Sequence, residues 1–293
     1  MERRVLTAYL FLACVILPML QDPTRNRLGG SIDGSGSLIV LVENRSGIAL
    51  CTDRRSYNII DGASDRTVKL RVVSQHSVFA VIGITSVLDR WLTKKYDLFD
   101  DVTRLLAAAA CVRVEECRPA LEYGLRASYL AYHPQYSRSA QEAALGSTDL
   151  AFSVYFVETA PKQKVTVTVL SLFDYRLHGQ GVEMRSENLT ESLKHSPIID
   201  GQTEVSNAIL GGKDSRFAAF WKDPSLQSVW FHRKTLKTTT AEDFEFARKL
   251  VRWTNAYHSV VARTPTLVSA EADCGFLPNG GEFSLQLAKG AKP

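Results

Sequence analysis

Two apolar segments in the first fifth of the chain most constrain how it can fold. Residues 36–42 form a run rich in β-branched side chains, and residues 46–55 form a second run after a short polar turn. Apolar runs separated by turn residues are typical of a β-hairpin. Antiparallel strands of similar length would bring Ser37, where the first begins, next to Asp53, where the second ends. The pattern therefore predicts a polar corner built from residues that are far apart in the sequence.

The remaining sequence predicts strands, then helices, then strands again. The expected segments are strands at 56–60, 68–73 and 77–83, two or three helices from 86 to 132, strands at 150–157, 164–172 and 173–185, a polar loop at 188–201, a strand at 205–212, a helix at 241–262 and a last strand at 282–288. Neither an internal repeat nor an interdomain linker interrupts residues 37–293. We expect one α+β domain there: a four-layer αββα sandwich, with two antiparallel sheets between helical layers.

The N-terminal segment differs from everything after it. Residues 1–21 have a short basic start and an apolar core, which is typical of a signal peptide or a membrane anchor. Residues 22–36 are rich in Gly, Ser, Asp and Arg, as in a flexible linker or propeptide. We expect the protein to be exported, either periplasmic or secreted, or to be tethered to a membrane through residues 1–21. If the leader is not a true signal, the protein is cytoplasmic.

Composition argues against several classes of function. The net charge of +4 is small for 293 residues, and basic runs with interleaved aromatic residues are absent, so nucleic-acid binding is not expected. The cysteines and histidines lack the spacing of a metal site, so we predict neither a metal nor a cofactor. Four cysteines could form disulfides in an oxidising compartment. However, Cys111 and Cys117 are awkwardly spaced within a predicted helical region, which favours buried free thiols.

The predicted corner could acquire catalytic chemistry if the chain were cut before Ser37. The new terminal residue would carry a hydroxyl group and an α-amine, whose ordinary pKa of about 7.7–8.0 leaves part of it neutral at pH 7. One residue would then hold both the nucleophile and the general base. Such a site also needs a cation, a carboxylate that holds it and an N–H for the oxyanion. Lys69, Asp53 and Gly83, on neighbouring predicted strands, are the candidates.

The spacing of these residues resembles that of the proteasome-type, β-subunit-like peptidases of the N-terminal-nucleophile hydrolases. In that family a propeptide ending in Gly precedes a hydroxyl residue, with an Asp sixteen positions later, an Arg two beyond it, a Lys sixteen beyond the Asp and a Gly fourteen beyond the Lys. The residues at these positions here are Gly36, Ser37, Asp53, Arg55, Lys69 and Gly83.

The resemblance implies a role for each member of the corner. Ser37 would attack a peptide or amide carbonyl, and its own amine would carry the proton. Lys69 would lower the pKa values of both groups, Asp53 would orient Lys69, and the Gly83 N–H would hold the oxyanion. The same groups would cleave the Gly36–Ser37 bond. The resemblance thus implies a self-processing hydrolase of peptide or protein substrates that assembles as a homo-oligomer or ring.

The sequence departs from the family pattern at three positions. The nucleophile is Ser where the family usually has Thr, and the Ser and Asp that support the terminal amine are replaced by Gly212 and Phe276. Asp214 and Asp273 lie nearby in the sequence and are candidates for that supporting role. The alternative is a non-catalytic proteasome-like subunit that acts in assembly or binding.

Overall fold

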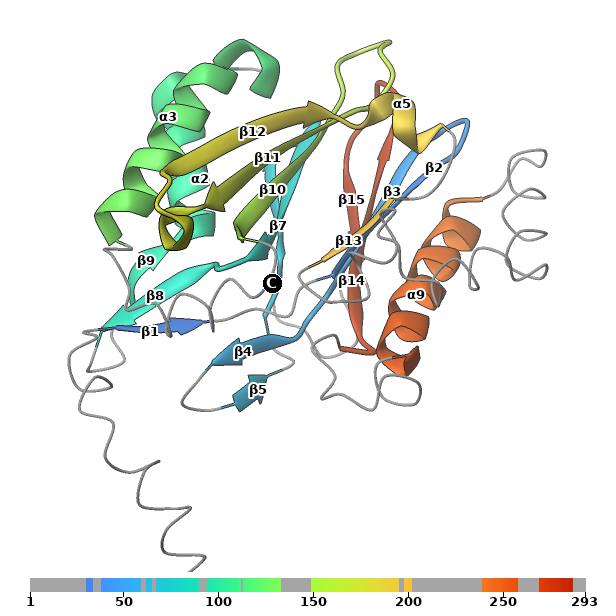
Figure 1. Ribbon diagram of the computed structural model, residues 1–293. Helices are drawn as coiled ribbons and strands as arrows, with labels where there is room; N and C mark the ends of the chain where they lie inside the picture. Colours follow the sequence, from blue (N-terminus) through green and yellow to red (C-terminus); the bar gives the residue numbers. More distant parts are fainter. Residues whose placement is uncertain are drawn as a thin grey trace, which may run out of the picture.

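The computed structural model describes residues 30–33, 38–58, 62–64, 67–89, 94–111, 113–132, 149–194, 198–201, 239–257 and 269–286 (Figure 1). The leader 1–21, most of the linker 22–36, the strand expected at 205–212 and the site candidates Gly36, Ser37 and Asp214 lie outside these residues. Among the described helices, none has the length and apolar character needed to cross a membrane.

The strands are β1 (Gly30–Asp33), β2 (Leu38–Glu43), β3 (Gly47–Asp53), β4 (Ser56–Asn58), β5 (Gly62–Ser64), β6 (Leu70–Ser74), β7 (Ser77–Gly83), β8 (Ser86–Asp89), β9 (Lys94–Asp97), β10 (Leu150–Glu158), β11 (Thr166–Asp174), β12 (Val182–Asn188), β13 (Ile198–Gly201), β14 (Ala272–Pro278) and β15 (Ser284–Gln286). The helices are α2 (Leu98–Ala109), α3 (Val114–Tyr132), the 3-10 turn η1 (Arg176–His178), α5 (Thr190–Leu193) and α9 (Thr240–Tyr257).

The predicted N-terminal hairpin is confirmed by the pairing of β2 with β3. The strands are antiparallel, with Ile39 opposite Thr52. The side chain of Asn44 shapes the turn, because its Oδ1 accepts hydrogen bonds from Ser46 N at 2.7 Å and from Gly47 N at 2.9 Å. Such side-chain to main-chain bonds are the reason that Asn is favoured in turns. The hairpin therefore follows from local sequence.

Two antiparallel sheets form the centre of the described structure. One has the strand order β13-β2-β3-β14-β15, and the other has the order β12-β11-β10-β7-β6. Helix α9 covers the outer face of the first sheet, and α2 and α3 cover the outer face of the second (Figure 1). A third apolar cluster fills the space between the sheets. The fold is thus α+β, and its layers form the predicted αββα sandwich.

The central strands are apolar at nearly every position because both of their faces are covered. Along β2, Leu38, Val40 and Val42 pack in the cluster under α9, whereas Ile39 and Leu41 pack between the two sheets. Strands buried on both faces read as continuous apolar runs rather than as an alternating pattern. The apolar run at residues 38–42 is therefore a strand in the middle of the sandwich.

Two predictions for the first half of the chain need correction. Gly30–Asp33, expected within the flexible linker, forms strand β1 and pairs antiparallel with β8. The helical region expected from residue 86 begins with strands β8 and β9, and its first helix starts only at Leu98. Asp97 sets that start, since its Oδ1 accepts hydrogen bonds from Phe99 N at 2.8 Å and Asp100 N at 3.2 Å, as an N-cap does.

The second half of the chain also differs from expectation. The strand expected at 173–185 is broken after Asp174, whose carboxylate accepts a hydrogen bond from Arg176 N at 3.1 Å and turns the chain into η1. The loop expected at 188–201 contains α5 and β13, because Leu193 and Ile198 are buried in the cluster between the sheets. Strand β14 was not predicted from sequence. Its Asp, Gly and Pro disfavour strands, and pairing with β3 and β15 overrides that preference.

The described cysteines form two disulfides, which corrects the expectation of free thiols. Cys51 and Cys274 lie directly opposite each other on β3 and β14, with a Cα–Cα distance of 4.1 Å. Cys111 and Cys117 are joined across 5.8 Å between their Cα atoms. This second bridge forms because α2 ends at Ala109 and α3 begins at Val114, so Cys111 lies in the connection and not in a continuous helix.

The buried carboxylate of Glu158, at the end of β10, generates a prediction about pH and stability. Both oxygens of Glu158 accept from Val114 N, at 3.1 and 3.2 Å, and Ser77 Oγ donates to one of them at 3.2 Å. Burial nevertheless raises the pKa of Glu158 above its ordinary value. The stability that depends on the protonated form is therefore complete at low pH and is lost as pH rises through the folded-state pKa.

We expect Glu158→Gln, which is neutral at every pH, to remove this loss. The unfolding free energy of the variant minus that of the wild type should grow as the pH rises from 4 to 8. Urea unfolding at several pH values measures it. Glu187→Gln, at an exposed position on β12, is the control and should show no such trend. A difference that is flat, or that falls with pH, would contradict this account of Glu158.

Candidate functional site

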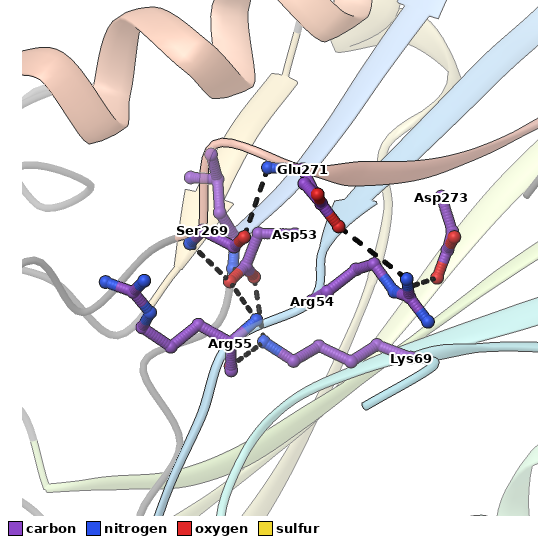
Figure 2. A network of polar contacts seen from close by, with 8 residues as sticks. Asp53, Arg54, Arg55, Lys69, Ser269, Glu271 and Asp273 are labelled. Carbon is purple, nitrogen blue, oxygen red and sulfur yellow. Dashed lines mark hydrogen bonds and ion pairs between the residues drawn. The ribbon is translucent and has the colours of Figure 1, made fainter. Parts of the chain in front are cut away.

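A buried ion pair connects the two sheets at one end of the sandwich. Lys69 lies directly before β6 in one sheet, and Asp53 is the last residue of β3 in the other. Lys69 Nζ is 2.8 Å from Asp53 Oδ1, and both side chains are at most 1% exposed (Figure 2). Charges buried so completely require partners of opposite charge and further hydrogen bonds. The corner is therefore a specific arrangement and not a surface contact.

Main-chain amides from three segments complete the surroundings of the Asp53 carboxylate. Oδ1 also accepts from Leu38 N at 2.7 Å. Oδ2 accepts from Arg55 N at 2.9 Å and from Ser269 N at 3.1 Å. Hydrogen bonds to an ionised acceptor are about twice as strong as neutral ones. Together with Lys69, these donors fix the orientation of both carboxylate oxygens.

Arg55 contributes to the corner through its main chain. Its N–H donates to Asp53, and its carbonyl oxygen accepts from Lys69 Nζ at 2.5 Å. In Figure 2 its side chain extends away from Lys69. The ammonium of Lys69 is thus held between a carboxylate and a carbonyl oxygen. The structure brings the predicted supporting residue to the corner, with the peptide group rather than the guanidinium in contact with the ion pair.

Gly83 ends β7, the strand beside Lys69. Val81 N lies 3.4 Å from Lys69 O, and Gly83 is two residues further along the same strand. Its φ of +97° is in the region that favours glycine, and a Cβ at this position would lie 2.3 Å from Ala151 O. Only glycine therefore fits this strand end, where the candidate oxyanion donor is expected.

Asp273 lies close to the corner but is paired with a different residue. Asp273 is on β14, opposite Thr52 of β3, and its Oδ2 is 3.4 Å from Arg54 Nε. Arg54 also reaches Glu271 at 3.8 Å, and its side chain extends away from Asp53 (Figure 2). The structure thus places this candidate against Arg54 rather than against Lys69. Its predicted role in supporting a terminal amine stays a prediction.

Sequence reasoning missed two contributors to the site. Arg54 stands between Asp53 and Arg55 in the sequence, but the sequence does not show that Asp273 on β14 is its buried partner. Ser269 was missed because its contribution is a main-chain N–H, three residues before a strand that the sequence does not predict. Its Oγ accepts from Glu271 N at 3.1 Å and shapes that strand entry. The sequence signal for this turn is a serine two positions before an acidic residue, Glu271.

The arrangement has a clear electrostatic consequence. A buried cation favours the anionic or neutral form of ionisable groups beside it. The amide nitrogen that Asp53 holds, Leu38 N, is the one that joins Leu38 to Ser37.

The described residues contain no group of three or more His, Cys, Asp or Glu side chains that could hold a metal ion.

Comparison with known proteins finds likeness among solved structures. No protein-family model matches the chain, and no curated protein matches it. Among solved structures, the chain is similar to a Gly-1 mutant of Anbu from Hyphomicrobium sp. strain MC1. The match has a TM-score of 0.45 and 11% identity, and covers 88% of this chain and 89% of that one. A likeness at this level assigns no function, so the chemistry of the corner has to be judged on its own geometry.

Removing Lys69 should be costly, because it leaves the Asp53 carboxylate buried without its counter-ion. We expect Lys69→Met to lower the unfolding free energy by about 3–5 kcal/mol. Arg71→Met is a matched control two residues away, since Arg71 pairs with Asp100 at a site where both side chains are about half exposed or more. It should cost less than about 1 kcal/mol. Chemical denaturation at pH 7 measures both, and equal losses would contradict the special status of the buried pair.

Proposed function

We propose that this chain is a self-processing N-terminal serine hydrolase of the proteasome type, which cleaves peptide or amide bonds in peptide or protein substrates. The observation that carries the proposal is that one carboxylate oxygen of Asp53 accepts two hydrogen bonds. Asp53 Oδ1 accepts from Lys69 Nζ and also from the N–H of Leu38, the residue that directly follows Ser37. The ion pair is thereby tied to the chain at the point where the terminal nucleophile would begin.

Maturation would use the same corner. Ser37 Oγ attacks the carbonyl carbon of Gly36, the peptide C–N bond breaks, and the acyl group moves from nitrogen to oxygen. Water then hydrolyses the resulting ester. The products are a propeptide that ends in a Gly36 carboxylate and a chain that begins with the free α-amine of Ser37. The Gly- and Ser-rich sequence before this bond would give it the freedom to reach the required geometry.

Substrate hydrolysis would follow in two stages. The α-amine of Ser37 accepts the hydroxyl proton while Oγ attacks the substrate carbonyl, and Gly83 N–H donates to the oxyanion that forms. The amine then gives the proton to the leaving nitrogen, which leaves an ester on Ser37. Water, deprotonated by the same amine, releases the acid product. Lys69, fixed by Asp53, keeps the amine neutral enough to act as a base.

The supporting groups at the far end of the chain enter the proposal differently. Asp273 would support the corner indirectly, because it holds the side chain of Arg54, the residue that directly follows Asp53. Asp214, outside the described residues, stays a candidate for direct support of the amine. Assembly as a homo-oligomer or ring rests on the resemblance in sequence. Export or membrane tethering through residues 1–21 is supported by the two disulfides, since disulfides persist in oxidising compartments.

The mass of the folded full-length chain tests self-processing. The wild type should yield a product that begins at Ser37, whereas Ser37→Ala should keep the Gly36–Ser37 bond intact. Ser35→Ala, in the same linker, is the control and should be cut normally. Cleavage of Ser37→Ala at the wild-type rate would rule out the mechanism. A folded wild-type chain that stays uncut would favour the non-catalytic subunit.

A further inference from the structure

We propose that the Cys51–Cys274 disulfide is a redox-controlled clamp on the candidate site, which is complete only while this bond is closed. The consequence for hydrolysis rests on the proposed function, but the clamp itself does not. If it holds, the protein is active in an oxidising compartment and is held inactive wherever thiol reductants open the bond.

The clamp joins the two strands that carry the acidic residues of the corner. In the pairing of β3 with β14, Cys51 lies opposite Cys274 and Asp53 lies opposite Ala272. The bridge is therefore two residues from the Asp53 carboxylate. Its two cysteines are separated by 223 positions in the sequence, so the bond cross-links two distant segments that the β3–β14 pairing also holds together.

The residues leading into β14 supply one contact of the corner, and β14 itself supplies an ion pair beside it. Ser269 N donates to Asp53 Oδ2, and Asp273, next to Cys274, holds Arg54. Both contacts depend on the register and closeness of β14 against β3. Asp273 and Cys274 are consecutive residues of β14, so the Arg54–Asp273 pair and the disulfide lie on opposite faces of the strand pair.

The sulfur atoms lie in a tightly filled apolar layer. Cys51 and Cys274 are fully buried and pack in one cluster with Leu38, Phe244 and Ala247, between the sheet and α9. Two thiols need more room than a disulfide does, and close-packed interiors tolerate little added volume. Reduction would therefore push β14 and β3 apart beside Asp53 instead of leaving the strands unchanged.

The redox step is a thiol–disulfide exchange. Two equivalents of a thiol, or one dithiol, supply two electrons and two protons, so that the S–S bond breaks, Cys51 and Cys274 become thiols, and the reductant becomes a disulfide. Reducing compartments keep protein thiols in that form, and oxidising ones do not. This difference would couple completion of the site to the compartment.

The second disulfide provides a matched control. Cys111–Cys117 closes the connection between α2 and α3, on the outer side of the other sheet (Figure 1). Neither cysteine takes part in the contacts of Asp53 or Lys69 that define the corner. If losing any cross-link loosens the corner, removing either disulfide should do so. If Cys51–Cys274 is a specific clamp, only its removal should loosen the corner.

Amide hydrogen exchange on the full chain tests the clamp without relying on hydrolysis. In Cys51→Ala/Cys274→Ala, peptides that contain Ser269 and the start of β14 should exchange about tenfold faster or more than in the wild type. Cys111→Ala/Cys117→Ala should leave them unchanged. Unchanged exchange in the first variant, or equal acceleration in both, overturns the proposal.

Two further measurements keep the test decisive. If the first variant does not fold, as judged by circular dichroism, the wild type is compared with and without dithiothreitol, with alkylation and mass spectrometry counting the opened bonds. A Cys51–Cys274 bond that stays closed in the native chain, or opens without exposing β14, overturns the proposal. Hydrolysis should fall about tenfold or more when the bond is absent. Undiminished hydrolysis overturns it, whereas an inactive wild type refutes only the hydrolase function.

Discussion

The Asp53–Lys69 ion pair is the interaction on which the rest of the site depends. Two charges placed between sheets at 1% exposure or less lose their hydration, and the pair compensates for this only with good geometry and additional hydrogen bonds. The N–H groups of Leu38, Arg55 and Ser269 supply those bonds. The pair thereby connects the first hairpin, the start of β6 and the entry to β14. A change in any of these segments would disturb the charge at the corner.

The sandwich explains why these segments meet. Strands β2 and β3 lie in the middle of one sheet, so their ends are fixed by neighbours on both sides. Lys69 comes from the other sheet and crosses the space between them. Gly83 ends the strand next to Lys69, where its positive φ and the closeness of Ala151 leave no room for a side chain. The fold thus brings the N–H of Leu38, a buried cation and a candidate oxyanion donor to one end of the sandwich.

Sequence reasoning succeeds where local chemistry determines the structure. The hairpin follows from two apolar runs and an Asn-centred turn, and the pairing of Asp53 with Lys69 is implied by the resemblance to the proteasome-type pattern. Such reasoning fails where tertiary contacts decide. Strand β14 contains Asp, Gly and Pro and exists because β3 and β15 flank it. The amide of Ser269 carries no side-chain signal, and the Cys51–Cys274 bridge depends on a strand that the pattern does not reveal.

Labelling by an epoxyketone tests the central claim, that the ion pair serves a terminal serine, most directly. Such an electrophile closes a ring only on a residue that offers both a hydroxyl group and a free α-amine. The account predicts one adduct, on the peptide that begins at Ser37, and a strong loss of labelling in a folded chain that lacks the Lys69 ammonium. A chain that begins at Ser37 and is not labelled there, or labelling that does not depend on Lys69, would contradict it.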